Sequence, residues 1–303
     1  MLEPGDGHAL SQPGILASPS PVARSLTFRF VPDVDPRPAL ARLRDGFRVE
    51  DGVVGLGPGL ARATGREIPG LRPFPALAGA GLAAPSTQQA LWAYLRGGDR
   101  TGTFDATVRL QTLLGEALVL DDALDTFVYR GGRDLSGYED GTENPKGDRA
   151  VAAAVVVGAD AGRPGLTGSS FVAVQRWTHD LVAFRRFSAE RRDMTIGRRF
   201  DSNEEIEDAP ASAHVKRTAQ ESYDPETFMV RRSMPWASAG EQGLEFVAFV
   251  ESLDRFERQL VRMMGLDDGV TDALFTFSRP VTGGYYWCPP IAGARLDLSA
   301  LGV

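Results

Sequence analysis

The order of strand-like and helix-like segments constrains this chain most. Leu26, Phe28 and Phe30 alternate with polar residues, which is the two-residue period of a half-buried strand. Residues 36–47 then carry apolar side chains at helical spacing. The remaining segments of this first series are strand-like at 53–56 and 90–95, helical at 107–118 and strand-like at 125–129. The series therefore reads β-α-β-β-α-β.

A second series follows the turn-rich stretch 131–147. Its segments are strand-like at 151–157 and 170–177, helical at 179–187, strand-like at 228–232 and 244–251, helical at 253–264, and short and aromatic at 285–287. Gly265 ends the amphipathic helix. Two consecutive split β-α-β units predict an α+β protein with two ferredoxin-like halves, each a mainly antiparallel sheet with helices on one face.

Chain length and composition set the domain organisation that we expect. The chain has 303 residues, enough for two domains of about 100 to 150 residues each. Because the start is rich in Pro, Gly and Ser, we predict a disordered leader over 1–24, followed by domains over 25–135 and 136–303. Met1 to Pro21 shows neither a signal-peptide pattern nor a twin arginine, so we expect a cytoplasmic protein.

Charge, hydropathy and cysteine content exclude several classes of function. The net charge is −7, with 33 basic residues scattered among 40 acidic ones, so we expect no nucleic-acid partner. No apolar run approaches the roughly 18 residues of a membrane span. Cys288 is the single cysteine, which excludes an internal disulfide and any site built from several cysteines. We interpret it as a small apolar residue beside Trp287.

The segment Gly137 to Pro145, GYEDGTENP, is the first candidate site. It packs two glycines and three carboxylates into nine positions. The first interpretation is a surface turn between the two domains that has no role in function. However, an aromatic Tyr138 is unusual in a solvated linker, and glycine on both sides of a carboxylate lets backbone approach a ligand closely. The residues leave both interpretations open.

The chain has three histidines, of which one is a candidate metal ligand. His8 lies in the leader. We expect His179 to be a first-turn polar residue of a helix, where the positive end of the helix dipole suits neither an imidazolium nor a metal. In the segment ASAHVKR, small residues before His214 leave room for a planar group. Lys216 and Arg217 could pair with anionic arms of this planar group or be solvated. Whether His214 is a metal ligand therefore stays open.

Arg231 and Arg232 lie next to each other in a predicted strand, VRRSMPW. Alternation sends their side chains to opposite faces of the sheet. An inward arginine is costly unless it meets an anion or a strong acceptor. The alternatives are a site that contains one inward arginine, or an edge strand whose arginines both reach water.

The GYEDGTENP segment, His214 and the strand 231–236 together resemble the dye-decolorizing peroxidase family, specifically its B-type members. The likeness covers most of the chain from about Leu26. Further similar segments are 85–88, 91–100, 176–181, 196–198 and 252–256. The resemblance implies a peroxidase with haem b held mainly by the C-terminal half. It also implies hydrogen peroxide and an organic electron donor as substrates, and a homo-oligomer.

The resemblance also implies roles for single residues. His214 would be the proximal iron ligand, with Glu226 as the carboxylate that holds it. Asp140 and Arg231 would activate peroxide on the distal side, and Ser233 would join that pocket. The resemblance also implies that the cofactor contacts Gly141, Thr142 and Arg198.

These roles predict how activity depends on pH. Asp140 would carry the peroxide proton from one oxygen to the other, and Arg231 would polarise the leaving oxygen. Because an arginine keeps a nearby carboxylate ionised into acid solution, we expect an acidic optimum for dye oxidation. Large dyes would be oxidised through surface tryptophans or tyrosines.

Two other functions stay open. The first is a haem- or porphyrin-handling, deferrochelatase-like protein with incidental peroxidase activity. The second is encapsulin cargo, because some family members are packaged through a C-terminal tail, and residues 295–303 could be such a tail or a final packed segment.

Overall fold

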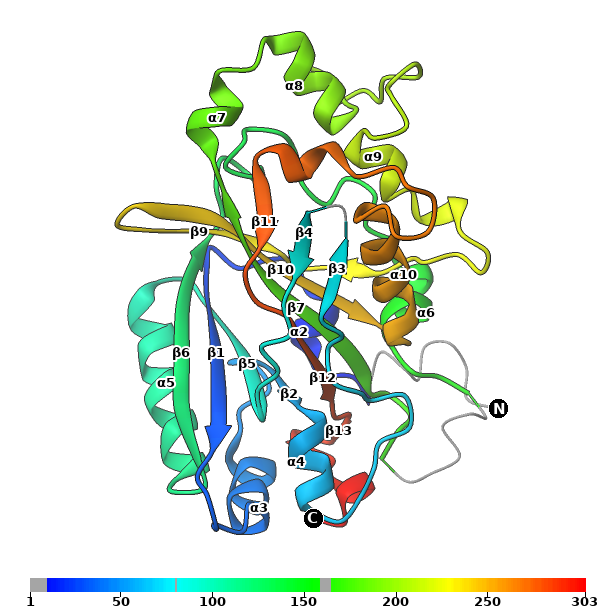
Figure 1. The fold of residues 1–303 in the computed structure, drawn as a ribbon. Coiled ribbons are helices and arrows are strands. Elements are labelled where there is room, and N and C mark those ends of the chain that lie inside the picture. Colours follow the sequence, from blue (N-terminus) through cyan, green and yellow to red (C-terminus); the bar gives the residue numbers. More distant parts are fainter. Residues whose placement is uncertain (1–9, 80, 159–164) are drawn as a thin grey trace.

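A computed structural model describes residues 10–79, 81–158 and 165–303, and one twisted sheet runs through it (Figure 1). Within these residues the sheet has ten strands in the order β6-β1-β5-β2-β12-β7-β10-β8, with β11 on β7 and β9 on β10. Their bounds are β1 Val22–Phe30, β2 Gly52–Leu56, β5 Leu91–Gly97, β6 Leu118–Phe127, β7 Ser170–His179, β8 Val230–Arg231, β9 Met234–Ser238, β10 Glu241–Val250, β11 Ser278–Pro280 and β12 Gly284–Cys288. The strand pairings of this sheet are antiparallel.

The first half of the sheet is covered by α3 (Arg37–Gly46) and α5 (Arg100–Leu114), which pack against each other. Helix α5 begins earlier than residue 107, where its pattern was expected to start. The reason is a local cap: the Asp99 carboxylate accepts a hydrogen bond from the Gly102 amide at 2.9 Å. Gly115, with φ of 57°, ends the helix, and β6 starts three residues later at Leu118.

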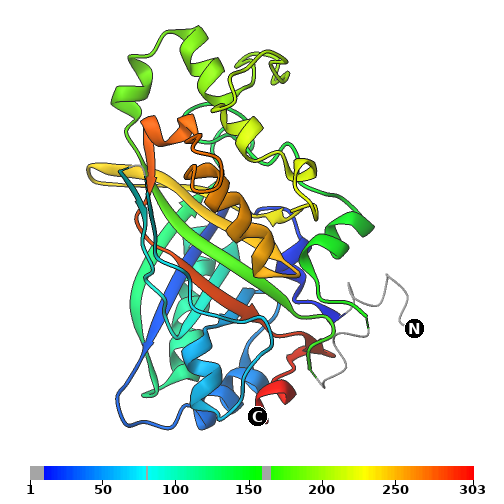
Figure 2. The ribbon, with the colours of Figure 1, turned by 45° about the vertical axis from the view of Figure 1, so that its right-hand side comes forward.

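The second half repeats the arrangement with β7, β10 and α10 (Leu253–Met263). Figure 2 shows α10, in orange, crossing in front of β7, in green. Strand β12 lies between β2 and β7 and so joins the two halves into one sheet. The predicted α+β class with two ferredoxin-like halves is confirmed. The predicted domain limits, 25–135 and 136–303, stay a prediction.

Shorter elements complete the fold. They are α2 Pro13–Leu16, α4 Pro58–Ala63, β3 Leu77–Gly79, β4 Leu82–Ala84, α6 Asp148–Ala154, α7 Leu181–Arg185, α8 Ala189–Ile196, α9 His214–Arg217, η2 Gln220–Ser222, η3 Ala273–Thr276, β13 Ile291–Ala292, β14 Arg295–Leu296 and η4 Ser299–Leu301. Helices α7 and α8 extend from the end of the molecule opposite the C-terminus (Figure 1). In the part of the chain that is described, none of the helices has both the length and the apolar character needed to cross a membrane.

Two predicted elements are wrong. Residues 151–157 were expected to form a strand, but Asp148–Ala154 is helix α6, which buries Ala150, Val151 and Ala154. A short apolar run is compatible with a buried helix turn as well as with a strand, so periodicity alone could not decide. The helix expected from His179 begins only at Leu181, because His179 is the last residue of β7.

The predicted disordered leader is also wrong for residues 10–24. Helix α2 lies in this segment, and β1 already begins at Val22. The Gln12 amide accepts a hydrogen bond from the Val54 N–H at 2.9 Å and donates to the Val54 and Pro289 carbonyls. Ile15 is fully buried. Residues 1–9, which include His8, lie outside the described residues.

The C-terminal segment 295–303 is packed against the core rather than free. Leu296, Leu298 and Leu301 are buried in the main hydrophobic cluster. This arrangement agrees with the final packed segment that the sequence left open. Packaging as encapsulin cargo and homo-oligomer formation stay predictions.

Candidate active site

A cavity lies between the sheet and α10. Alternation along β7 turns Gln175, Trp177 and His179 to the same face, and all three line the cavity. From β10, Leu244 and Phe246 form the same wall. The opposite wall comes from α10 and α9, and the loop that follows β6 completes the site. A cavity with a mainly apolar lining and a few polar side chains suits a small-molecule ligand or cofactor.

Strand register decides which of the two adjacent arginines enters the cavity. Arg231 pairs with Ala248 of β10, and Ala248 packs in the cluster that contains Phe256 of α10. Arg231 therefore faces α10 and lines the cavity, which confirms the inward arginine. Arg232 points the other way and donates to the Leu16 carbonyl at 2.7 Å. The buried Nε atom of Arg231 has no hydrogen-bond partner among the described residues.

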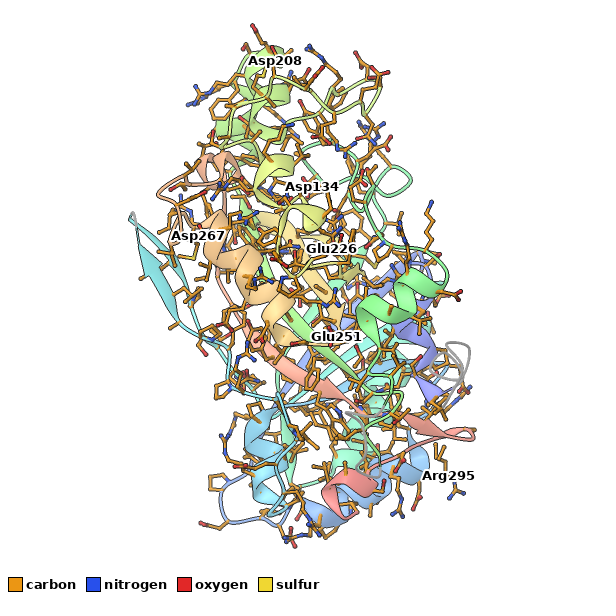
Figure 3. All side chains as sticks on the ribbon, turned by 90° about the vertical axis from the view of Figure 1, so that its right-hand side faces the viewer. Asp134, Asp208, Glu226, Glu251, Asp267 and Arg295 are labelled. Carbon is orange, nitrogen blue, oxygen red and sulfur yellow. The ribbon has the colours of Figure 1, made fainter. Side chains whose placement is uncertain are left out.

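His214, the first residue of α9, also lines the cavity. Its Nδ1 atom donates to Oδ2 of Asp272 at 2.8 Å, and the Asp272 side chain is fully buried. Nδ1 is thereby engaged, so Nε2 is the ring nitrogen available to a ligand. The prediction that Glu226 holds His214 is wrong. Glu226, labelled in Figure 3, is exposed and lines a separate surface hollow with Lys146 and Arg149.

Ion pairs with protein carboxylates fix the helix that carries His214. Arg217 is buried and makes a bidentate ion pair with the Asp268 carboxylate, with N–O distances of 2.7 and 2.8 Å. It also donates to the Arg262 carbonyl near the end of α10. Lys216 pairs with Glu205 at 3.1 Å. Both basic residues after His214 are therefore engaged within the chain, and Arg217 holds α9 against the end of α10.

The charge of His214 is coupled to the other side of the cavity. Burial lowers the pKa of His214, but the Asp272 carboxylate raises it by more, so the net shift is upward. Arg231 opposes this shift and Asp140 supports it. The imidazole, the guanidinium and both carboxylates therefore share one electrostatic environment.

The GYEDGTENP loop faces the cavity, as one of its two interpretations predicted. Tyr138, Glu139 and Asp140 line the cavity. Asn144 fixes the loop to β8, because its Oδ1 atom accepts from the Arg231 N–H at 2.8 Å and its Nδ2 donates to the Arg231 carbonyl at 3.2 Å. The loop thus positions Asp140 and Arg231 together.

Ser233 and Gly141 line a second hollow beside the cavity. Asp140 and Arg231 also line this hollow. The Ser233 hydroxyl accepts from the Val247 amide at 3.2 Å. Gly141 has φ of +71°, and a Cβ there would come within 2.8 Å of the Asn144 amide nitrogen. Only glycine leaves the Asn144 contact to Arg231 undisturbed.

Thr142 and Arg198 do not line the cavity. The Thr142 hydroxyl accepts from the Asn203 side chain at 3.1 Å. Arg198 donates to Glu143 at 2.8 Å and to the Asn203 carbonyl at 3.0 Å. In this structure both residues tie the GYEDGTENP loop to the segment around Asn203.

His179 is part of the cavity wall, which differs from the expected first-turn position in a helix. It is buried, with Nδ1 2.7 Å from the Ser278 hydroxyl and Nε2 3.1 Å from Oδ1 of Asp134. Burial raises the pKa of Asp134, but the contacts with His179 and with Ser136 together lower it by more, so the net shift is below the usual value of 3.8. Asp134, labelled in Figure 3, lines the same cavity as His214.

Buried polar atoms without partners test whether the cavity fits the expected cofactor. Both amide atoms of Gln175 and the indole nitrogen of Trp177 have no hydrogen-bond partner among the described residues. Such atoms are rare in folded proteins unless a ligand or water meets them. The remaining wall is apolar, with Phe246, Leu260 and Met263. A planar, mainly apolar cofactor with a metal atom that binds Nε2 of His214 fits this lining.

Sequence reasoning missed Asp272, Gln175 and the pair of Asp134 with His179. Asp272 had one local signal, since it caps η3 through the Leu274 amide at 2.8 Å, but a cap does not indicate a histidine partner 58 residues away. The polar residue Gln175 within an apolar strand was a detectable signal.

Comparisons with known proteins agree with this geometry. Residues 131–293 match the family model described as Dyp-type peroxidase, C-terminal. The chain is 34% identical over 260 residues to a dye-decolorizing peroxidase of Rhodococcus erythropolis, covering 80% of this chain and 74% of that protein. It is 32% identical over 228 residues to one of Mycobacterium tuberculosis, covering 73% and 67%.

Solved structures show the same likeness. A dyp-type peroxidase protein of Shewanella oneidensis has a TM-score of 0.84 at 26% identity, covering 96% of both chains. A variant of DypB from Rhodococcus jostii RHA1, solved in complex with heme, has a TM-score of 0.82 at 27% identity, covering 90% of this chain and 94% of that one.

Proposed function

The chain belongs to the dye-decolorizing peroxidase family, and we propose that it is a haem b peroxidase that uses hydrogen peroxide to oxidise dyes, phenolics or other one-electron donors. The likeness to DypB of R. jostii, a protein solved in complex with heme, supports the cofactor and the B-type assignment. Haem, when bound, supplies an iron that exchanges electrons with peroxide and donor.

The observation that carries the proposal is the pairing of His214 with Asp272 on a cavity that also contains Asp140 and Arg231. His214 is the proposed iron ligand through Nε2. Asp272 fixes the ring orientation and makes the imidazole a stronger electron donor, which is the usual role of a carboxylate behind a ligating histidine. Gln175 and Trp177 offer hydrogen-bonding groups to the bound cofactor.

Asp140 and Arg231 act on peroxide in this proposal. Asp140 takes the proton that peroxide loses from one oxygen and returns it to the other as the O–O bond breaks. Arg231 is permanently charged and stabilises the negative charge that develops on the leaving oxygen. Asn144 positions Arg231 through two backbone contacts, at 2.8 and 3.2 Å.

Ser233 and Gly141 belong to the access route in this proposal. They line the hollow that adjoins Asp140, and the small Ser233 side chain and the absence of a side chain at Gly141 leave room for a molecule of the size of peroxide. The Ser233 hydroxyl oxygen accepts from the Val247 amide, which leaves its O–H free to donate to a molecule in the hollow.

The absorbance spectrum of the purified protein tests the proposal. We expect a Soret band that changes when one equivalent of hydrogen peroxide is added, and that is lost or shifted in His214→Ala. Asp140→Ala should keep the band but react with peroxide about 10²-fold or more slowly. A protein produced with adequate haem that shows no such band would overturn the proposal. Slow turnover with every donor, together with ready haem transfer to an apo-acceptor, would favour the haem-handling function instead.

A further inference from the structure

Tyr138 has an unusual environment within the cavity wall. It comes two residues before Asp140, is 5% exposed and lines the cavity. Its hydroxyl donates to Oδ1 of Asp193, in α8, at 2.5 Å. This separation is at the short end for a phenol that donates to a carboxylate. A phenol within the cavity is thus joined directly to an anionic acceptor outside it.

Such a pairing matters for the oxidation of tyrosine. A phenol that loses an electron becomes strongly acidic, so its oxidation is favourable only where a base can take the proton. Burial and the nearby Asp193 carboxylate raise the pKa of Tyr138, so the hydroxyl keeps its proton before oxidation. Asp193 Oδ1 already accepts the hydrogen bond, and the proton can move to it without any movement of heavy atoms.

Other buried tyrosines offer a poorer acceptor. The Tyr223 hydroxyl donates to the Arg217 carbonyl at 2.8 Å and the Tyr94 hydroxyl to the Arg232 carbonyl at 3.3 Å. A backbone carbonyl is a far weaker base than a carboxylate. Tyr285 faces a carboxylate, Glu257, but at 3.4 Å. Tyr138 therefore both lines the cavity and makes a short hydrogen bond to a carboxylate base.

Tyr138 also reaches towards the surface. Its ring meets Phe200 edge to face, with centroids 5.2 Å apart and an interplanar angle of 84°. Phe200 is 42% exposed, and the Arg133 guanidinium lies 5.8 Å from the centre of its ring. The Phe200 amide donates to the same Asp193 oxygen at 3.2 Å. Tyr138 is therefore in direct ring contact with an aromatic side chain that reaches solvent.

We propose that Tyr138 relays oxidising equivalents from the cavity to donors at the surface, with Asp193 as its proton acceptor. This inference rests on the proposed peroxidase function, because peroxide is the oxidant. In the first step Tyr138 loses one electron to the oxidised cofactor and its hydroxyl proton to Asp193, and becomes a neutral tyrosyl radical. In the second step a donor near Phe200 gives one electron, and the proton returns from Asp193. The donor leaves oxidised by one electron.

The direct test is electron paramagnetic resonance of the haem-loaded protein frozen after one equivalent of hydrogen peroxide, without donor. We expect a tyrosyl signal in the wild type, narrowed when the tyrosines carry deuterated rings. The signal should be lost in Tyr138→Phe. Asp193→Asn keeps a hydrogen-bond acceptor but removes the base, so we expect the radical to form about 10²-fold more slowly. Tyr223→Phe, which also removes a buried hydroxyl contact, is the matched control and should keep the signal.

The outcomes separate this relay from the proposed function. A Soret band that does not respond to peroxide would contradict the peroxidase itself. A normal peroxide response with an unchanged tyrosyl signal in Tyr138→Phe would overturn the relay alone. If Asp193→Asn forms the radical as fast as the wild type, Asp193 is not the proton acceptor. The Tyr138–Asp193 contact then only holds the loop against α8. Thermal unfolding of each variant shows whether a lost signal reflects a lost fold.

Discussion

Nδ1 of His214 lies 2.8 Å from Oδ2 of Asp272, and the Asp272 side chain has no exposed surface. The other carboxylate oxygen of Asp272 accepts from the Leu274 amide, also at 2.8 Å. Both oxygens are therefore held, one by η3 and one by the imidazole. Because the carboxylate cannot rotate without losing a contact, the orientation of the His214 ring is set by a short helix 58 residues further along the chain.

Asp272→Asn should weaken haem binding by about 10- to 100-fold, because a neutral amide holds the ring less firmly and donates less electron density to it. Glu226→Gln is the matched control and should leave haem affinity unchanged, since Glu226 is exposed and apart from the cavity. Haem titration of the two apoproteins measures the difference. Equal losses in both variants would contradict the structural assignment of Asp272.

Arg231→Ala should slow the reaction with peroxide by about 10²- to 10³-fold, because it removes the charge that stabilises the leaving oxygen. Arg29→Ala is the matched control and should react with peroxide at the wild-type rate, because the Arg29 side chain is 56% exposed on β1 and lines neither the cavity nor the adjoining hollow. Stopped-flow absorbance after mixing with peroxide gives both rates. The assignment fails if the two variants are slowed alike.

Asp134→Asn should lower the free energy of unfolding at pH 7 by about 1–3 kcal/mol, because it weakens a mostly buried contact with His179. The folded protein depresses the pKa of Asp134 below 3.8, so this stabilisation is fully present above that pH and is lost as pH falls below it. The difference in the free energy of unfolding between wild type and variant should therefore become smaller in acid. Urea unfolding at a series of pH values checks this, with exposed Asp105→Asn as the control. A gap that is constant down to pH 2 would rule out the linkage.

Ile15→Ala should destabilise the protein by about 2–4 kcal/mol, because Ile15 is fully buried and its truncation leaves a cavity. Val34→Ala, at a largely exposed position, should change stability by less than about 0.5 kcal/mol. Chemical denaturation of both variants measures the difference. An unaffected Ile15→Ala protein would mean that α2 contributes little to the core.

Strong local patterns determined much of the fold. The alternation at Leu26, Phe28 and Phe30 predicted β1, and the amphipathic spacing after residue 252 predicted α10. Elements with weak patterns were misplaced: the apolar run at 151–157 fits a helix turn or a strand equally, and the Pro- and Gly-rich start hid the contacts that hold Gln12 and Ile15. Those contacts join residues far apart in sequence.

The sequence by itself determined the family resemblance, the α+β class and the candidates His214, Asp140 and Arg231, because their motifs are local. Only the tertiary structure decided which arginine enters the cavity, through the pairing of Arg231 with Ala248. It also decided that Asp272 rather than Glu226 holds His214. Local patterns specify the face of an element on which a side chain lies, whereas strand register and helix docking decide what that face meets.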